Sequence, residues 1–151
     1  LDMLGRELEA LEYAKKAIEL EPENEDYHFF IAGLFAKYDL PDDALNAYEK
    51  TIELGYLKED VWVDYIQLCL TINNDTIAKD AVDQALEVHS ENHYIKLYEA
   101  VLNFRSKNED EGFEQLVDLL VLKPELIEEF ILFYPKGVET EEIQFLIESL
   151  K

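Results

Sequence analysis

Three stretches of the sequence share one pattern: ALEYAKKAIELEP at residues 10–22, ALNAYEKTIEL at residues 44–54, and AKDAVDQALEV at residues 78–88. Each begins with an alanine, and each alanine lies 34 residues from the next. Further positions keep the same register without a gap, in these columns: Ala10, Ala44, Ala78 and Gly112; Ile18, Ile52, Leu86 and Leu120; Leu20, Leu54, Val88 and Leu122. An ungapped period of this length predicts a repeat protein.

Each repeat contains two segments whose apolar residues recur every three or four positions, which is the spacing of an amphipathic helix. Residues that favour turns, such as Asn, Asp, Pro and Gly, separate these segments. The sequence therefore predicts helices over residues 6–20, 25–38, 41–54, 59–71, 75–88, 93–106, 109–122, 125–133 and 140–150. Gly5 is predicted to form the turn after a truncated helix that ends at residues 1–4.

The repeat resembles that of the tetratricopeptide repeat (TPR) family. The three quoted stretches read like the second helix of that repeat, and Trp62 stands where an aromatic residue opens the family's first helix. The resemblance implies an all-α fold, a right-handed α-solenoid of antiparallel helix pairs, within one contiguous domain. We expect a truncated repeat at 1–24, repeats at 25–58, 59–92 and 93–124, and a degenerate capping repeat at 125–151. The chain would then be the C-terminal part of a longer TPR protein.

The last segment departs from the repeat and is expected to form a capping helix pair. Pro135 and Gly137 interrupt its helical pattern, and Thr140 is expected to cap the final helix. An end repeat has no neighbour to cover its apolar face, so a solenoid needs such a cap. We expect this face to be sealed by Phe130, Phe133, Ile143, Leu146 and Leu150.

The chain is acidic along its whole length. Its 151 residues include 35 Asp or Glu and 13 Lys or Arg, which give a formal net charge of -22. Such a surface repels nucleic-acid phosphates and anionic lipids, so binding to nucleic acid or to a membrane is not expected. The single cysteine excludes an internal disulfide, and no apolar run approaches the roughly 20 residues that a membrane helix needs. A cytoplasmic location is favoured.

No catalytic centre is evident in the sequence. Gly-rich phosphate loops, nucleophile elbows and zinc-protease motifs are absent, so we expect neither an enzyme nor a cofactor or metal site. His89 and His93 have a spacing that suits two metal ligands on one helix. A predicted turn separates them, so both are expected to be exposed turn residues. Cys69 falls in a core column and is expected to be a small buried hydrophobic residue.

In TPR proteins the first helix of each pair lines a concave groove, and the resemblance assigns the matching columns here to partner binding. The residues it implies are Phe29, Gly33, Lys37, Val63, Gln67, Thr71, Tyr94, Leu97, Val101, Phe104 and Arg105. Lys37 and Arg105 share a column, and they either contact an acidic group of a ligand or pair with neighbouring carboxylates. The aromatic run YHFFIAGLFAKY at 27–38 is otherwise expected to be core, with Phe30 packing on Leu34.

The expected function is a protein interaction scaffold that binds a peptide or helix of a partner protein in this groove. The family's clamp for a partner's C-terminal carboxylate is not carried over, because its positions hold Phe29, Gly33, Asp64, Tyr94 and Tyr98. Three alternatives stay open. The chain could be a structural or self-associating module, forming homo-oligomers. It could be an acidic surface that sequesters a basic partner. RNA reading by helical repeats is the third, and the acidic charge disfavours it most.

Overall fold

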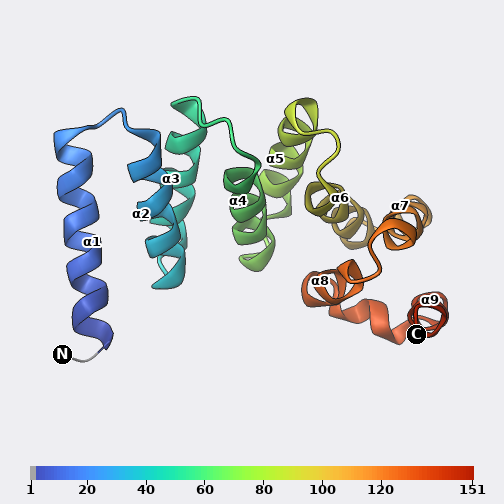
Figure 1. Ribbon diagram of the computed structural model, residues 1–151. Coiled ribbons are helices and arrows are strands. Elements are labelled where there is room, and N and C mark those ends of the chain that lie inside the picture. Colours follow the sequence, from blue (N-terminus) through green and yellow to red (C-terminus); the bar gives the residue numbers. More distant parts are fainter. Residues whose placement is uncertain (1–2) are drawn as a thin grey trace. The chain divides into compact units, whose positions relative to one another are not determined.

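The computed structural model describes residues 3–151, and within them the chain is helical with no strand (Figure 1). The elements are α1 (Met3–Leu20), α2 (Glu25–Lys37), α3 (Pro41–Glu53), α4 (Glu59–Thr71), α5 (Asp75–Val88), α6 (His93–Arg105), α7 (Glu109–Leu122), α8 (Leu126–Phe133), the 3-10 helix η1 (Pro135–Glu139) and α9 (Glu141–Ser149). The chain divides into two compact units, of which the first ends at Leu68 and the second runs from Cys69 to Lys151.

The predicted helices are confirmed at nearly every boundary, but the predicted turn at Gly5 is wrong. Helix α1 begins at Met3 and passes through Gly5 without a break. The other repeats turn at this position because the turn residues bond to carbonyls of a preceding helix, as Leu40 does to Phe35. At Gly5 the corresponding carbonyls would belong to residues upstream of Met3, and residues 1 and 2 lie outside the described part of the chain.

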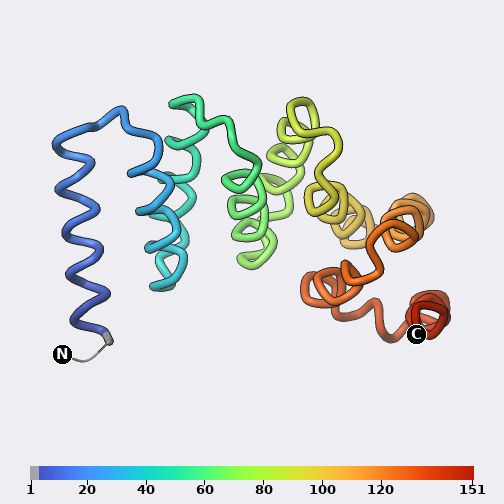
Figure 2. The backbone as a smooth tube through the Cα atoms, viewed as in Figure 1, coloured from blue at the N-terminus to red at the C-terminus, as the bar shows by residue number. Residues whose placement is uncertain are grey.

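The turns between paired helices repeat with the same period as the sequence. Asp39, Asn73 and Lys107 adopt left-handed backbone conformations, with φ of 59°, 58° and 66°, and they lie 34 residues apart. After each of them an amide donates back across the end of the preceding helix, from Leu40 to Phe35 O at 2.9 Å, from Asn74 to Cys69 O at 2.8 Å, and from Asn108 to Asn103 O at 2.8 Å. Figure 2 shows the reversal between α2 and α3. The repeat is therefore a property of the backbone as well as of the side chains.

Asparagine side chains cap the N-termini of several helices. Asn24 Oδ1 accepts from the amides of Asp26 and Tyr27, at 3.1 and 3.3 Å. Asn74 Oδ1 accepts from Ile77 N at 3.2 Å, and Asn92 Oδ1 accepts from Ile95 N at 3.0 Å. Such bonds satisfy amides that have no partner within the first helical turn.

The core of the first unit forms where α2 and α3 pack together and where α4 begins. Its buried apolar residues are Ile31, Ala32, Ala44, Leu45, Ala47, Tyr48, Val61, Trp62, Tyr65 and Ile66, together with Leu11 and Ala14 of α1. Phe30 was expected in this core, and that prediction is wrong because 58% of it is exposed. Its ring lies at an open apolar cleft of about 370 Å³ that is lined by Ala10, Tyr13 and Tyr27 among others.

In the second unit, α8 covers the last regular helix pair. Phe130 and Phe133 are buried, as predicted for a cap, and Ile143 of α9 is buried with them. The Phe130 ring lies 5.2 Å from that of Phe104, and the Phe133 ring lies 5.7 Å from that of Tyr98, measured between centroids. Aromatic pairs at these separations contribute beyond their buried area.

The remaining cap residues follow the prediction less closely. Leu146 and Leu150 are only half-buried. Thr140 stands at the N-cap position of α9, but its hydroxyl donates to Gly137 O at 2.9 Å and makes no capping bond. The reason is local, because the 3-10 helix η1 leaves the Gly137 carbonyl within reach of the threonine hydroxyl.

Candidate functional site

The predicted partner-binding residues fall on both units. Five of them belong to the first: Phe29, Gly33 and Lys37 on α2, and Val63 and Gln67 on α4. Six belong to the second: Thr71, Tyr94, Leu97, Val101, Phe104 and Arg105. The two sets of residues have different surroundings.

In the second unit the predicted surface of α6 is largely core. Leu97 and Val101 are fully buried, and Phe104 is 7% exposed. Helix α8 packs on this side of α6 and places Phe130 and Tyr134 against the Phe104 ring. The assignment of these three residues to an open binding surface is therefore wrong, because their side chains are buried in the core of the second unit.

The two cations of the predicted groove column are both paired with carboxylates of the chain. Arg105 Nη1 lies 2.7 Å from Asp75 Oδ1 and donates to Leu70 O at 3.2 Å. Its Nε and Nη2 donate to Phe133 O at 3.2 and 2.8 Å. Lys37 Nζ lies 3.7 Å from Glu7 Oε1 on α1. Of the two expectations for these cations, pairing with neighbouring carboxylates is therefore the one observed. The hydrogen bonds of Arg105 to Phe133 O also tie α8 to α6.

Aromatic rings follow one another along the first unit. The Phe29 ring lies 4.9 Å from that of Tyr56 and 6.2 Å from that of Tyr48, and Tyr48 lies 6.1 Å from Tyr65. Tyr56 reaches Phe29 because Gly55, with φ of 91°, ends α3 in a conformation that other residues rarely adopt. Tyr48 and Tyr65 are buried, whereas Phe29 and Tyr56 are half-buried and keep part of their rings in solvent.

Gly33 leaves the backbone of α2 uncovered one helical turn beyond Phe29. Gly33 lies in the middle of α2 along the sequence and is exposed to solvent. A Cβ added there would meet no atom within 4 Å. A glycine inside a helix is less stable than alanine by roughly 0.5–1 kcal/mol. No packing contact in the described residues explains its presence here.

Acidic side chains surround Tyr56. The carboxylates of Asp60, Asp26 and Asp64 all act on the Tyr56 hydroxyl. Burial, followed by these charges with that of Asp60 the largest, raises the pKa of Tyr56 to about 12. Burial and the charge of Asp60 also raise the pKa of the Asp64 carboxyl above its usual range.

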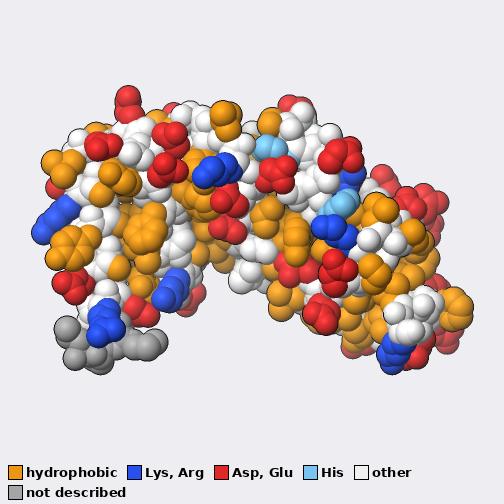
Figure 3. All heavy atoms as spheres, in the orientation of Figure 1, with side chains coloured by type: hydrophobic (Ala, Val, Ile, Leu, Met, Phe, Trp, Pro, Cys, Tyr) orange, Lys and Arg blue, Asp and Glu red, His pale blue; other side chains and the backbone are white. Residues whose placement is uncertain are grey.

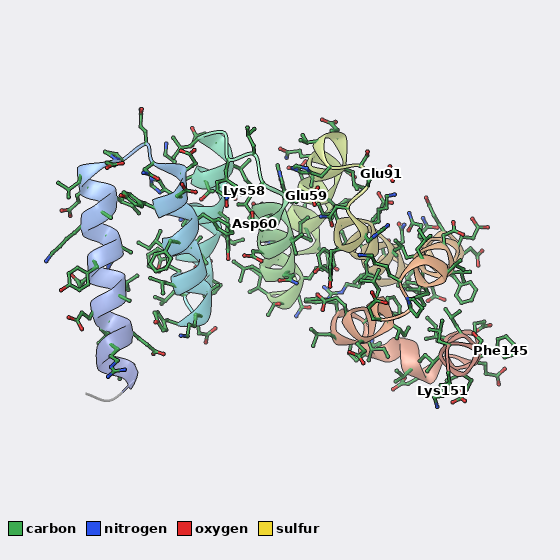
Figure 4. The ribbon with its side chains drawn as sticks, viewed as in Figure 1. Lys58, Glu59, Asp60, Glu91, Phe145 and Lys151 are labelled. Atoms are coloured by element: carbon green, nitrogen blue, oxygen red, sulfur yellow. The ribbon has the colours of Figure 1, made fainter. Side chains whose placement is uncertain are left out.

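We call this surface of the first unit the α2–α4 face and define it by Phe29, Gly33, Tyr56, Asp60, Val63 and Asp64. Residues three or four apart share one side of a helix, which relates Phe29 to Gly33 on α2 and Asp60 to Val63 and Asp64 on α4. Val63 and Gln67 are half-buried. Figure 4 shows Lys58 and Asp60 beside the loop that joins α3 to α4.

Tyr56 was not predicted to take part in partner binding. Asp60 falls in a predicted groove column but was not among the predicted partner-binding residues, and Asp64 was named only as a residue that does not fit the carboxylate clamp. Asp26 and Asp60 occupy the same repeat column, so the sequence contained a signal for acidic residues at equivalent positions of two neighbouring repeats. Tyr56 aligns with Pro22 and Pro124, and that column gave no reason to expect a ring beside Phe29. In the second unit Thr71 and Tyr94 are exposed, and they remain predicted partner-binding residues.

The other candidates for chemistry have structural surroundings. Cys69 is fully buried, as predicted. His89 ends α5 and His93 starts α6, so the turn separates them as expected, although both are half-buried rather than exposed. In the described part of the chain no three His, Cys, Asp or Glu side chains are grouped so that they could hold a metal ion. No helix within residues 3–151 has the length and apolar character needed to cross a membrane.

Comparison by sequence finds no matching family model and no matching curated protein. Comparison by structure finds clear matches. The crystal structure of MamA has a TM-score of 0.77 at 16% identity, over 99% of this chain and 93% of that one. YrrB, described as a TPR protein with an unusual peptide-binding site, has a TM-score of 0.73 at 13% identity, over 97% of this chain and 77% of that one.

A tetratricopeptide repeat protein from Parabacteroides merdae has a TM-score of 0.77 at 19% identity. The match covers 98% of this chain and 60% of that chain, so the present chain spans about three fifths of that protein. These similarities show that the chain has the TPR fold, an all-α solenoid of antiparallel helix pairs.

Proposed function

We propose that this chain is an interaction scaffold that binds a peptide or helix of another protein on the α2–α4 face. The observation that carries the proposal is Gly33. No packing contact among residues 3–151 requires a glycine at this position, and the space above it is open. A partner that lies against the backbone of α2 gives the glycine a use, because any side chain would hold the partner away.

The residues around Gly33 supply contact area for such a partner. Phe29, Tyr56 and Val63 are half-buried, so each has apolar surface that a partner can remove from water. Binding energy in protein interfaces is concentrated in a few aromatic or apolar anchors, and rigid aromatic rings lose little entropy on binding. Phe29 and Tyr56 are held by each other and by Tyr48, so they are already arranged before a partner arrives.

The fold similarity supports the same function, since one of the matched structures is described as having a peptide-binding site. That site belongs to YrrB, and it adds to this proposal only that a protein with this fold can bind a peptide. The proposal is for binding alone and assigns no catalytic group to the chain.

A random-peptide phage library, selected on the immobilised chain, tests this function. The selection is repeated on Gly33→Gln, which places a neutral side chain in the open space and favours the helix. Asn46→Gln on the exposed side of α3 is the matched control. We expect peptides that bind the wild type and Asn46→Gln and that lose about tenfold or more in affinity on Gly33→Gln. Failure to enrich any peptide with this dependence would overturn the proposal.

A second candidate, self-association, is favoured by a specific surface of the first unit. Figure 3 shows apolar side chains gathered over α1 and α2. The exposed ones include Leu4, Leu8, Tyr13, Leu20 and Phe30. Exposed apolar patches of this kind often mark interfaces. Light scattering over a range of concentrations tests it, with Leu8→Lys and Phe30→Lys together expected to abolish any dimer. A monomer at every concentration of the wild type rules this candidate out.

A further inference from the structure

We propose that the segment bound on the α2–α4 face is basic, with a Lys or Arg side chain held over Tyr56 beside Asp60 and Asp64 and an apolar side chain placed against Phe29 and Val63. This inference rests on the proposed function, because it names the class of partner for the same surface. The sequence left open that the acidic surface as a whole binds a basic partner, and the present inference places that binding on one face.

The aromatic ring of Tyr56 lies among carboxylates. Tyr56 lies within the electrostatic reach of the carboxylates of Asp60, Asp26 and Asp64. A cation over an aromatic ring is attracted by the negative face of the ring, and nearby carboxylates add to that attraction. The chain shows this preference itself, because Lys58 Nζ lies 5.9 Å from the centroid of the Tyr56 ring.

Asp64 lacks a counter-charge among the described residues. It is half-buried, and no described Lys, Arg or His forms an ion pair with it. Burial of the Asp64 carboxyl and repulsion by the charge of Asp60 raise the pKa of Asp64. A half-buried carboxylate is most stable when it is paired. A cation from a partner would supply the missing charge.

A further feature of the α2–α4 face is independent of charge. Gly33 and Phe29 lie one helical turn apart on α2, so the open backbone adjoins an apolar ring. Highly charged chains attract any cation over their whole surface, whereas this face combines carboxylates with an aromatic ring and an uncovered stretch of helix backbone. A partner that uses all three is an extended or helical segment with basic and apolar side chains together.

The cations of the chain near this face do not remove its acidic character. Lys37 continues the α2 stripe beyond Gly33, but it is paired with Glu7 of α1. Lys58 is exposed in the loop before α4, and its Nζ lies 5.9 Å from the centroid of the Tyr56 ring. Against these stand Asp26, Asp60 and Asp64, which leave the face acidic.

The test uses the peptides from the selection described above and asks two further questions. First, the enriched sequences are scored for Lys and Arg against the unselected library. Second, affinities of labelled selected peptides are measured on Asp60→Asn with Asp64→Asn, and on Asp42→Asn with Asp43→Asn. The second pair removes two exposed carboxylates from the first turn of α3 and so matches the change in net charge.

We expect enrichment of Lys and Arg, a loss of about tenfold or more in affinity on Asp60→Asn with Asp64→Asn, and a change of less than about twofold on the matched control. Affinity should also fall as salt rises from about 50 to about 500 mM. Equal losses on both pairs would show general attraction to an acidic surface and would overturn the inference.

The outcomes separate this inference from the function on which it rests. Peptides that depend on Gly33 but are neutral or acidic would overturn the basic partner and leave peptide binding intact. Basic peptides that bind Gly33→Gln as well as the wild type would overturn both, because the α2–α4 face would then not be the binding site. Enrichment of basic peptides that depend on both Gly33 and the Asp60 and Asp64 carboxylates would support both.

Discussion

Helices α2 and α6 hold equivalent positions in the repeat, yet one presents a surface where the other forms a core. Phe29 and Gly33 of α2 correspond to Leu97 and Val101 of α6, each 68 residues further on. The first pair is half-buried and exposed, whereas the second pair is fully buried. The difference arises within the second unit, where α8 packs on α6. The position of a residue in the repeat therefore predicts which side of the helix it lies on. Whether that side is exposed or buried depends on the element that packs against it.

The largest test of this comparison is Leu97→Ala. Leu97 is fully buried, and removing a buried leucine side chain costs about 2–5 kcal/mol because a cavity remains. Phe29→Ala should cost distinctly less, since part of that ring is already in solvent. Urea unfolding followed by circular dichroism measures both. Equal losses of stability would mean that α2 is as deeply packed as α6.

The glycines sharpen the comparison, beginning with Gly112 of α7. A Cβ added there would lie 2.9 Å from Phe104 Cδ2 and 3.2 Å from Ala100 O, so α6 and α7 approach too closely for any side chain. Gly112→Ala should lower the free energy of unfolding by about 1–3 kcal/mol through overpacking. Thermal unfolding checks this, and an unchanged midpoint would show that the Phe104 ring moves aside without cost.

Gly33→Ala should have the opposite sign. The added methyl group enters open space, and the alanine removes the entropic cost of a glycine inside a helix. We expect the free energy of unfolding to rise by about 0.5–1 kcal/mol. Measured by the same urea titration, a loss of stability would show that Gly33 has a structural role, and the argument for a partner at this position would fail.

The smallest effect concerns the charge of Asp64. Its pKa is raised in the folded chain, so the charged form is disfavoured by folding and opposes stability at neutral pH. Asp64→Asn should therefore raise the free energy of unfolding at pH 7, by about 0.5 kcal/mol or less. The gain should shrink as the pH falls through the folded pKa and vanish well below the ordinary value of 3.8. Paired unfolding curves at several pH values measure it, and a destabilised variant at pH 7 would contradict it.

Most of the fold could be predicted from the sequence, because periodic apolar residues and turn residues determine helices locally. The capping role of Phe130 and Phe133 followed from the need to cover the last pair. The site was harder to predict. The burial of Leu97 and Val101 depends on where α8 packs, and the exposure of Phe30 depends on the open cleft beside α1. The contact between Tyr56 and Phe29 depends on the backbone conformation at Gly55, and the spacing of apolar residues does not predict that conformation.

Arg105 links three segments of the second unit through one guanidinium group. Its hydrogen bonds reach the end of α4 at Leu70, the start of α5 at Asp75 and the end of α8 at Phe133. Helix α8 cannot detach without leaving several of these donors unmatched, which is costly for a side chain that is 16% exposed. Helix α8 is thereby coupled to helices far earlier in the chain, so α5, α6 and α8 should lose their structure in one cooperative step.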